Sequence, residues 1–339
     1  VIFQCLLLSN VPFGTLLDPH WVFFLGKHYP TQQQDVAETD STRILQNQQG
    51  FRAPSLEDLQ AYSALFLESG GSCIPTAMDE TLADISEPFH PNTDVPFYWQ
   101  IPKAGTTYAL SYLSRCLNLT EATRKGQYSD ESELKVIEVN GYNYLNVDTT
   151  STEGMDRAKK LGLASSGLAD VVVSGYVSSA HRVFTPTNRG RLFALFRHPV
   201  DRLASKFYYL QFATWEKTYR PEVANMTIEQ YAQQESLVVG NWMVRMMVNK
   251  MNIERQQLVP EDLITAKEIL RRKCLIGLVS SMEESLLRIE AYFGWTVKDL
   301  YHRGTFAMTG EECKRQYFAG EQKENVHKHP TIIPGSEAW

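Results

Sequence analysis

Two short segments of this sequence place a basic side chain at a turn between an apolar run and an amphipathic helix. The first is FYWQIPKAGTT, residues 97–107, in which Lys103, Gly105 and two threonines follow the apolar run. A strand-to-helix junction leaves backbone N–H groups unpaired at the positive end of the helix dipole, where they can bind an anion. The pattern is typical of an anion site, but an ordinary turn capped by threonine has the same residues.

The second segment, LFALFRHPVDRLASKFYY (192–209), has the same organisation. Arg197 stands at the end of an apolar run, Pro199 sets the turn, and Ser205 follows eight positions after the arginine. The planar guanidinium group of arginine suits bidentate binding of phosphate. Two such junctions in one chain favour a ligand with two separated phosphate-type groups.

The elements that must position these residues alternate along the chain. Strands are expected at 97–101, 135–141, 170–175, 191–196 and 274–280, and helices at 55–70, 106–118, 200–215, 227–235, 241–250, 260–273 and 282–295. This alternation predicts an α/β fold, in which a central parallel sheet is flanked by helices on both faces. Ligands of such sheets bind at the carboxyl ends of the strands, where both segments would lie.

The chain is expected to divide into an N-terminal extension, residues 1–95, and a single α/β domain, residues 96–339. The turn-rich stretch HPNTDVP (90–96) marks the boundary. The extension contains a polar, Gln-rich stretch and one helix. Its first 17 residues are apolar but interrupted, so they are read as the remnant of a signal or anchor, or as a buried segment.

Composition narrows the functional classes. The chain has 339 residues, of which 43% are hydrophobic and 21% charged, an ordinary globular composition. The net charge of -6 argues against a nucleic-acid binder. The five cysteines form no CxxC pair, and no metal site is predicted.

In an oxidising compartment Cys274 and Cys313 would be the first pair to form a disulfide; otherwise they are free and buried. Sequons at Asn118 and Asn225 weakly favour a secretory lumen.

The two segments together resemble the sulfotransferases that use 3′-phosphoadenosine 5′-phosphosulfate (PAPS), especially the Golgi-type carbohydrate sulfotransferases. PKAGTT (102–107) matches the family pattern PKxGTT, and RHPVDRLAS (197–205) matches RxPxxRxxS. Residues 201–221 look like the corresponding helix of the uronyl, or heparan sulfate, 2-O-sulfotransferase branch. Residues 275–295 look like the late strand and helix of the family, and ENVHKHP (324–330) resembles a C-terminal loop that closes over the nucleotide. The resemblance covers about 97–330.

This resemblance implies a P-loop-like domain and a role for each residue of the first segment. Lys103 would stabilise the charge that develops on the leaving phosphate. The 5′-phosphosulfate would be held by the backbone and hydroxyl groups of Ala104, Gly105, Thr106 and Thr107.

The resemblance also implies a site for the other end of the nucleotide. Arg197 and Ser205 would hold the 3′-phosphate, and Lys328 of the C-terminal loop would contact the nucleotide. No metal is needed, because the lysine and the helix dipole supply the positive charge.

The proton acceptor is expected to be a histidine or a glutamate. Many relatives have Gly-His after the strand equivalent to 170–175, whereas this chain has GYVSSAH (175–181), with Tyr176 at the usual histidine position. His181 is the first candidate, since the pKa of histidine suits the task. Glu138, in VIEVNG, is the second. Either residue could instead be structural.

The implied function is transfer of the sulfuryl group from PAPS to a hydroxyl of a carbohydrate or polysaccharide acceptor. The implied location is the Golgi lumen, as a type II membrane protein whose anchor lies upstream of this fragment. A P-loop nucleotide kinase is an alternative, but it requires GxxxxGK[ST], and here Lys103 precedes the glycine. A catalytically silent glycan-binding protein is another, supported by the departure at Tyr176.

Overall fold

The computed structural model describes most of the chain after residue 72. The described residues are 73–126, 132–216, 219–234, 239–252, 255–296, 300–302, 305–320 and 332. The expected helix over 55–70 and the expected nucleotide contact of Lys328 lie outside them. Within these ranges, no helix has both the length and the hydropathy that crossing a bilayer requires.

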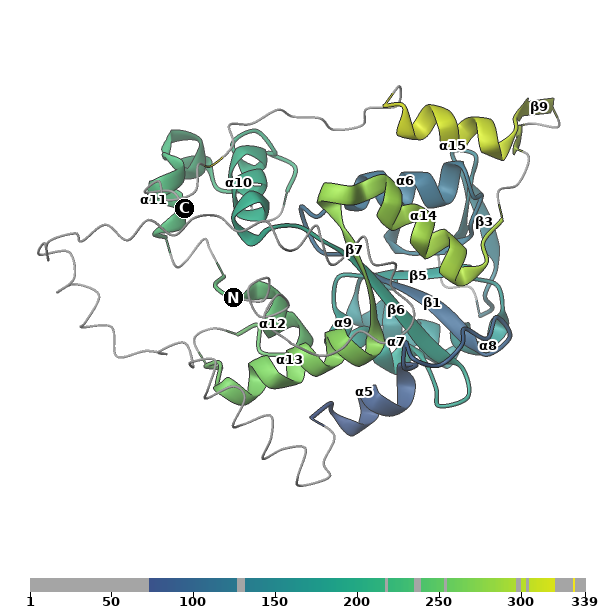
Figure 1. The fold of residues 1–339 in the computed structure, drawn as a ribbon, viewed down its shortest axis with the longest axis horizontal. Helices are drawn as coiled ribbons and strands as arrows, with labels where there is room; N and C mark the ends of the chain where they lie inside the picture. The colour runs from purple at the N-terminus through teal and green to yellow at the C-terminus, as the bar shows by residue number, and fades with distance from the viewer. Residues whose placement is uncertain are drawn as a thin grey trace, which may run out of the picture. The chain divides into compact units, whose positions relative to one another are not determined.

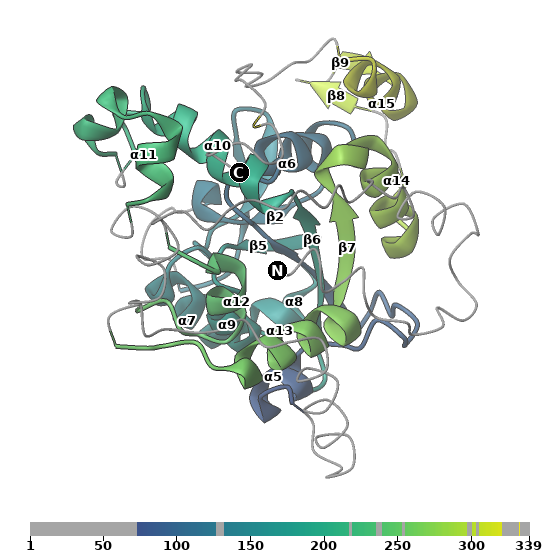
Figure 2. The same ribbon diagram turned by 60° about the vertical axis from the view of Figure 1, so that its left-hand side comes forward.

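A seven-stranded sheet forms the centre of the fold (Figures 1 and 2). Its strands are β1 (Asp94–Trp99), β2 (Glu121–Ala122), β3 (Val136–Val139), β4 (Tyr142–Leu145), β5 (Val171–Ser174), β6 (Arg189–Phe196) and β7 (Cys274–Leu278). Their spatial order is β3-β4-β2-β5-β1-β6-β7, and every neighbouring pair is parallel except β3 and β4. The predicted α/β fold with a central parallel sheet is confirmed for all but this edge.

The antiparallel edge arises from a tight hairpin. Asn140 and Gly141 have φ of 55° and 84°, the left-handed values that a two-residue hairpin turn requires. They reverse the chain, so that Val139 pairs with Tyr142. The strand expected over 135–141 therefore ends at Val139, and β4 follows where no strand was expected.

Helices cover both faces of the sheet, as predicted (Figure 1). One face packs against α6 (Thr106–Arg115), α14 (Met282–Phe293) and α15 (Gly310–Phe318). Helices on the other side are α5 (Thr76–Thr81), α7 (Thr152–Lys160), α8 (Leu163–Ser166), α9 (Val177–Ala180), α12 (Trp242–Met247) and α13 (Pro260–Lys273). The expected bounds 260–273 are confirmed for α13, whereas α6, α12 and α14 are shorter than expected.

The remaining elements are short or follow the carboxyl edge. Helix α10 (Pro199–Leu210) follows β6, and α11 (Ile228–Ala232) packs against it. Turns of 3₁₀ helix are η1 (Arg124–Gly126), η2 (His181–Val183), η3 (Pro221–Asn225) and η4 (Val279–Ser281), and a small second sheet consists of β8 (Leu300–His302) and β9 (Thr305–Met308).

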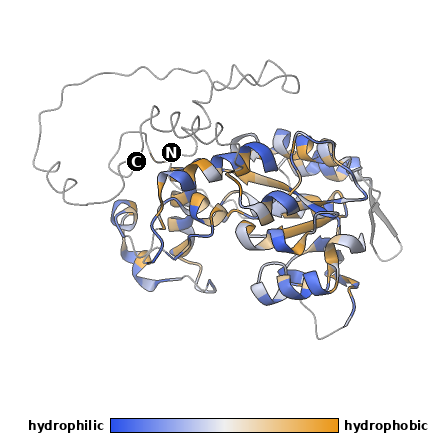
Figure 3. Ribbon diagram, turned by 90° about the horizontal axis from the view of Figure 1, so that it is seen from below, coloured by the Kyte–Doolittle hydropathy of each residue, from blue (hydrophilic) through white to orange (hydrophobic). Residues whose placement is uncertain are grey.

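The core lies between the sheet and its helices. On the α6 side, Tyr98 and Phe193 stack from neighbouring strands with ring centroids 5.0 Å apart, and Phe293 of α14 contacts Phe193 at 5.2 Å. Figure 3 shows apolar strands inside and polar residues on the outer helix surfaces. Each such buried side chain contributes about 1.5–3 kcal/mol of burial free energy. The sheet is thus a rigid support for the loops at its carboxyl edge.

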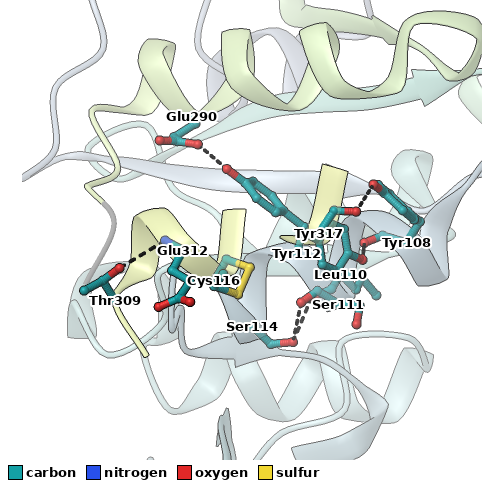
Figure 4. Close-up of a disulfide and its surroundings, with 11 residues drawn as sticks. Tyr108, Leu110, Ser111, Tyr112, Ser114, Cys116, Glu290, Thr309, Glu312 and Tyr317 are labelled. Atoms are coloured by element: carbon teal, nitrogen blue, oxygen red, sulfur yellow. Dashed lines mark hydrogen bonds between the residues drawn. A yellow bond between two sulfur atoms is a disulfide. The ribbon is translucent and has the colours of Figure 1, made fainter. Parts of the chain in front are cut away.

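A disulfide joins Cys116, at the end of α6, to Cys313 of α15 (Figure 4). The expected pairing of Cys274 with Cys313 is therefore wrong. Cys274 begins the edge strand β7, where its thiol is free but buried, and burial raises its pKa. Cys116 instead lies where α15 packs against α6. A disulfide is typical of oxidising compartments, so it indicates a protein of the secretory pathway.

Hydrogen bonds reinforce the contact between α6 and α15 (Figure 4). The hydroxyl of Tyr317 donates to the Tyr108 carbonyl at 2.5 Å, and the hydroxyl of Tyr108 donates back to the Tyr317 carbonyl at 3.2 Å. Tyr112 donates to Glu290 of α14, which also accepts from Lys314 at 2.8 Å. Because these contacts fix α6, they also fix the loop that precedes it.

Residues just before β1 pack against the same sheet. The amide of Ala83 donates to the Gly190 carbonyl of β6 at 2.9 Å. The fully buried Arg191 of β6 pairs with Asp94 and donates to the carbonyls of Glu87 at 3.1 Å and Pro88 at 3.0 Å. The division at residues 95 and 96 stays a prediction, because most of 1–95 lies outside the described residues.

Candidate functional site

The loop between β1 and α6 contains two residues with left-handed backbone conformation. The φ angle is 64° at Lys103 and 74° at Gly105. The turn is closed by the amide of Ala104, which donates to the Ile101 carbonyl at 3.2 Å. A positive φ is unfavourable for lysine, so the surrounding structure must hold this conformation. The loop therefore has a fixed, strained shape at the carboxyl end of β1.

The start of α6 leaves hydrogen-bond donors open. Gly105 is the N-cap residue, and no side chain caps the helix. The hydroxyl of Thr106 donates instead to the Ile101 carbonyl at 3.2 Å. The amides of residues 105–108 donate no hydrogen bond to any part of the chain that the structure describes. An ordinary threonine-capped turn is thus not what forms here, and the first turn can bind an anion through its backbone.

The two predicted segments meet at this loop. Strands β1 and β6 are neighbours, so Arg197 at the end of β6 lies beside the loop that follows β1. Its guanidinium group donates to the Lys103 carbonyl at 3.4 Å. Both side chains are half-buried. The structure therefore brings together the lysine and the arginine that the sequence placed 94 positions apart.

Positive charge accumulates here without direct neutralisation. Burial lowers the pKa of Lys103, and the nearby Arg197 lowers it further, while Glu216 acts in the opposite direction. Burial also lowers the pKa of Arg197, opposed by Asp201. In the described part of the chain, neither Lys103 nor Arg197 forms an ion pair within 4.0 Å of a carboxylate. A bound anion would relieve this repulsion.

One face of α10 completes the cluster. The Lys103 ammonium lies 3.8 Å from the centroid of the Tyr209 ring, and Ser205 is one helical turn before Tyr209. Arg202, on the same face, stacks over Trp242 at 5.3 Å, and its buried Nε has no hydrogen-bond partner among the described residues. Burial lowers the pKa of Lys206, the next cation on this helix, and Arg202 lowers it further. Tyr209 is thus the residue of α10 that contacts Lys103, and Arg202 and Lys206 add further half-buried cations along the same helix.

The remaining predicted binding residues with small side chains differ in their exposure to solvent. Ala104 is buried, and Thr107 is exposed at the start of α6. The Ser205 hydroxyl is half-buried and makes no hydrogen bond within the described ranges. The Ser205 hydroxyl therefore keeps its hydrogen-bonding capacity for a ligand.

His181 lies apart from this cluster. It caps α9, and its Nδ1 is 3.1 Å from the hydroxyl of Thr81 in α5. Burial lowers its pKa, and so do Arg182 and Lys159, which favours the neutral ring that can accept a proton. No contact joins His181 to Lys103 in the described part of the molecule, and the Nε2 atom makes no hydrogen bond there.

Glu138 is farther still. It is an exposed residue of the edge strand β3, opposite Asn143. Four strand spacings of about 4.8 Å, or about 19 Å in all, separate β3 from β1. The structure does not bring Glu138 to the loop at Lys103.

Three features were not found from the sequence. Tyr209 of α10 contacts Lys103, and Glu216, just after that helix, acts on the charge of Lys103; no local pattern in the sequence signals either interaction. Glu121 of β2 is a buried carboxyl group whose Oε1 has no hydrogen-bond partner in the described ranges. Burial raises the pKa of Glu121 to about 7, partly offset by Lys125. No local pattern marks the burial of Glu121, because β2 has only two residues.

A hollow of about 760 Å³ lies beside the loop, at the start of α14. Its lining residues are Ser280, Ser281, Met282, Glu283, Glu284, Leu287 and Arg288. Met282 also touches the position where a Cβ on Gly105 would lie. Two glutamates make this hollow a poor phosphate site, so the cluster of Lys103 and Arg197 is the better candidate for anion binding.

Comparison of the chain with protein-family models, with curated proteins and with solved structures finds no match. The fold and the site therefore rest on the chain's own geometry. That geometry is an α/β fold with a mostly parallel seven-stranded sheet, in which two strand-to-helix junctions form one cationic cluster at the carboxyl edge.

Proposed function

We propose that this protein is a PAPS-dependent sulfotransferase that acts on a hydroxyl group of a carbohydrate. The observation that carries the proposal is the meeting of Lys103 and Arg197, from neighbouring strands, with no carboxylate partner for either in the described ranges. A nucleotide with phosphate-type groups at its 3′ and 5′ positions fits two adjacent cationic junctions. By resemblance, PKAGTT would bind the 5′ end of that nucleotide and RHPVDRLAS the 3′ end.

The residues of the cluster fit this chemistry. The free amides at the start of α6 would hold the 5′-phosphosulfate, and a side chain larger than glycine at position 105 would meet Met282. Arg197 and Ser205 would hold the 3′-phosphate. When the acceptor oxygen bonds to sulfur, the bond from sulfur to the 5′-phosphate oxygen breaks, and the Lys103 ammonium stabilises the charge left on that oxygen. Holding the nucleotide and the acceptor hydroxyl in a reactive orientation would supply much of the rest of the rate acceleration.

The hydroxyl proton of the acceptor must pass to a base. We keep His181 ahead of Glu138, because β5, which precedes His181, is adjacent to β1, whereas Glu138 is on the far edge strand. The lowered pKa of His181 leaves its ring neutral at neutral pH, as a base requires. Its Nε2 is the atom available for this role, since Nδ1 lies against Thr81.

The proposal also covers location. The disulfide indicates the secretory pathway, and PAPS-dependent sulfation of carbohydrates belongs to the Golgi lumen in the family that the motifs resemble. We propose a type II membrane protein whose anchor lies outside the described residues. The acceptor is a glycan or polysaccharide, not a nucleic acid.

Nucleotide preference tests the proposal. A ligand that binds only the native state raises the melting temperature. The nucleotide product, 3′-phosphoadenosine 5′-phosphate, should raise it much more than ATP at equal concentration. Arg197→Ala should weaken nucleotide binding by about 2–4 kcal/mol, the range for losing one partner of a buried charged pair. Arg197→Lys should restore only part of the lost binding free energy, because lysine lacks the planar guanidinium group that binds phosphate through two hydrogen bonds.

The matched control is Arg271→Ala on α13. Arg271 is an exposed arginine paired with Glu268 at 2.6 Å, and such surface pairs contribute little to stability. This variant should bind the nucleotide like the wild type. Equal stabilisation by ATP, or unchanged nucleotide binding in Arg197→Ala, would remove the basis of the proposal.

A further inference from the structure

Two large aromatic residues are exposed just beyond α10, next to the cationic cluster. Trp215 is 69% exposed and Phe212 is 39% exposed. The other large apolar side chains with exposure above about a third in the described ranges are spread along the sequence, namely Val136, Leu168, Tyr176 and Val259. We call the surface formed by Tyr209, Phe212, Trp215 and Glu216 the α10 shelf. Exposed aromatic surface of this kind marks a binding site more often than isolated apolar residues do.

The α10 shelf is held in one arrangement. The ring centroids of Phe212 and Trp215 are 6.2 Å apart, and Tyr209 contacts both at 5.7 and 6.2 Å. The indole N–H of Trp215 donates to the Tyr209 hydroxyl at 3.2 Å, and that hydroxyl donates to Glu216 at 2.7 Å. The indole is therefore fixed while its surface stays open to solvent. A preorganised aromatic face loses little entropy when a ligand stacks on it.

The same tyrosine connects the shelf to the proposed transfer site. The Lys103 ammonium lies 3.8 Å from the Tyr209 ring centroid, so the Trp215 ring lies within about 10 Å of that ammonium. Glu216 is also close enough to raise the pKa of Lys103. A molecule stacked on Trp215 thus has its neighbouring units within reach of the transferred group.

We infer that the α10 shelf binds an uncharged sugar ring of the acceptor, an inference that rests on the proposed function. The C–H face of a hexose packs on an aromatic ring, and its hydroxyls require polar partners at the edge, which Glu216 and Tyr209 supply. The Glu216 carboxylate disfavours a sulfated or carboxylated group in direct contact with it, at the hydroxyl edge of the Tyr209 ring rather than over the ring face where Lys103 lies. The unit on the shelf is therefore neutral, and any acidic unit of the acceptor lies elsewhere along the chain.

The test measures binding of two oligosaccharides by calorimetry, with 3′-phosphoadenosine 5′-phosphate present at saturation. Chitohexaose is the neutral probe, and a hyaluronan hexasaccharide is the acidic probe. The wild-type protein should bind chitohexaose more tightly. Trp215→Ala should weaken that binding at least tenfold, as loss of a stacked ring does, and Trp215→Phe should keep most of it. Leu168→Ala, which removes an exposed apolar side chain elsewhere, should change nothing.

Further measurements separate this inference from the proposed function. Trp215→Ala should keep the full thermal stabilisation by the nucleotide. If that stabilisation disappears in a folded variant, the shelf holds the adenine and the inference is wrong. If the wild type binds neither oligosaccharide, or if Trp215→Ala binds chitohexaose normally, the inference also fails. Failure of the nucleotide to stabilise even the wild type would instead refute the proposed function.

Discussion

Gly105 allows a direct test of the loop that the proposed site depends on. Its φ of 74° is a conformation that costs a residue with a side chain about 1–2 kcal/mol. A Cβ at this position would also lie 2.3 Å from the Cε of Met282. Because that atom is the end of a flexible side chain, it can move away, and the backbone term should dominate. Gly105→Ala should therefore destabilise the protein by about 1–2 kcal/mol.

If the backbone conformation at Gly105 decides the cost, the stabilities of two variants should rank in the opposite order to the sizes of their side chains. Asparagine adopts left-handed backbone conformation more readily than alanine, so Gly105→Asn should destabilise less than Gly105→Ala although its side chain is larger. Met282→Ala in the Gly105→Ala background should recover little. Urea unfolding of the variants, followed by circular dichroism, measures these differences.

The same variants should affect the proposed nucleotide site. A shifted loop moves the free amides of residues 105–108, so Gly105→Ala should lose much of the thermal stabilisation by 3′-phosphoadenosine 5′-phosphate. The reasoning would be refuted by a Gly105→Ala protein that matches the wild type in both stability and nucleotide binding. It would also be refuted if Gly105→Asn were the less stable variant, since the contact with Met282 would then outweigh the backbone.

Two further predictions concern buried charges. The pKa of Glu121 is raised by burial to about 7, so between about pH 4.5 and 7 the folded protein holds a proton that the unfolded chain has released. The free energy of unfolding should therefore fall by roughly 3 kcal/mol as pH rises through this range. This fall should be absent in Glu121→Gln. The same pH dependence in both proteins would show that Glu121 is not the group that titrates. Arg191→Met should cost about 3–5 kcal/mol in urea unfolding, because it leaves the Asp94 carboxylate buried beside unpaired carbonyls, and Asp94→Leu in the same chain should recover part of that loss. Full stability of Arg191→Met alone would show that this buried pair does not hold the segment before β1.

Local patterns predicted much of the fold. The β-branched run VVVS predicted β5, and the continuous apolar runs at 191–196 and 274–280 predicted β6 and β7, because strands buried on both faces need no alternation of polar residues. The bounds of α13 followed from Pro260 at its first position and from basic residues in its last turn. The turn at Lys103 was predictable for a similar reason, since a glycine between a strand and a helix marks the left-handed conformation found at Gly105; that the turn binds an anion stays a prediction.

Features that depend on distant contacts were not predictable in this way. The pairing of Cys116 with Cys313 spans 197 residues and depends on how α15 packs against α6. The position of His181 depends on Thr81, 100 residues earlier. Strand β2 has only two residues, so no periodicity marks it. Each of these requires the tertiary arrangement, which a local pattern does not contain.

The most direct test of the central claim is transfer of radiolabelled sulfate from PAPS to a panel of glycans, with wild type and Lys103→Ala compared. The wild-type protein should label at least one glycan. Lys103→Ala should lower turnover by roughly a hundredfold or more, while nucleotide affinity falls less, because the loop amides and Arg197 remain. In the same assay, His181→Ala should lower turnover about 10²–10⁴-fold at unchanged nucleotide affinity. If turnover is instead lost in Glu138→Gln and kept in His181→Ala, Glu138 is the base. Nucleotide binding without transfer to any glycan would favour a silent glycan-binding protein, and full turnover in Lys103→Ala would contradict the proposed role of the cationic cluster.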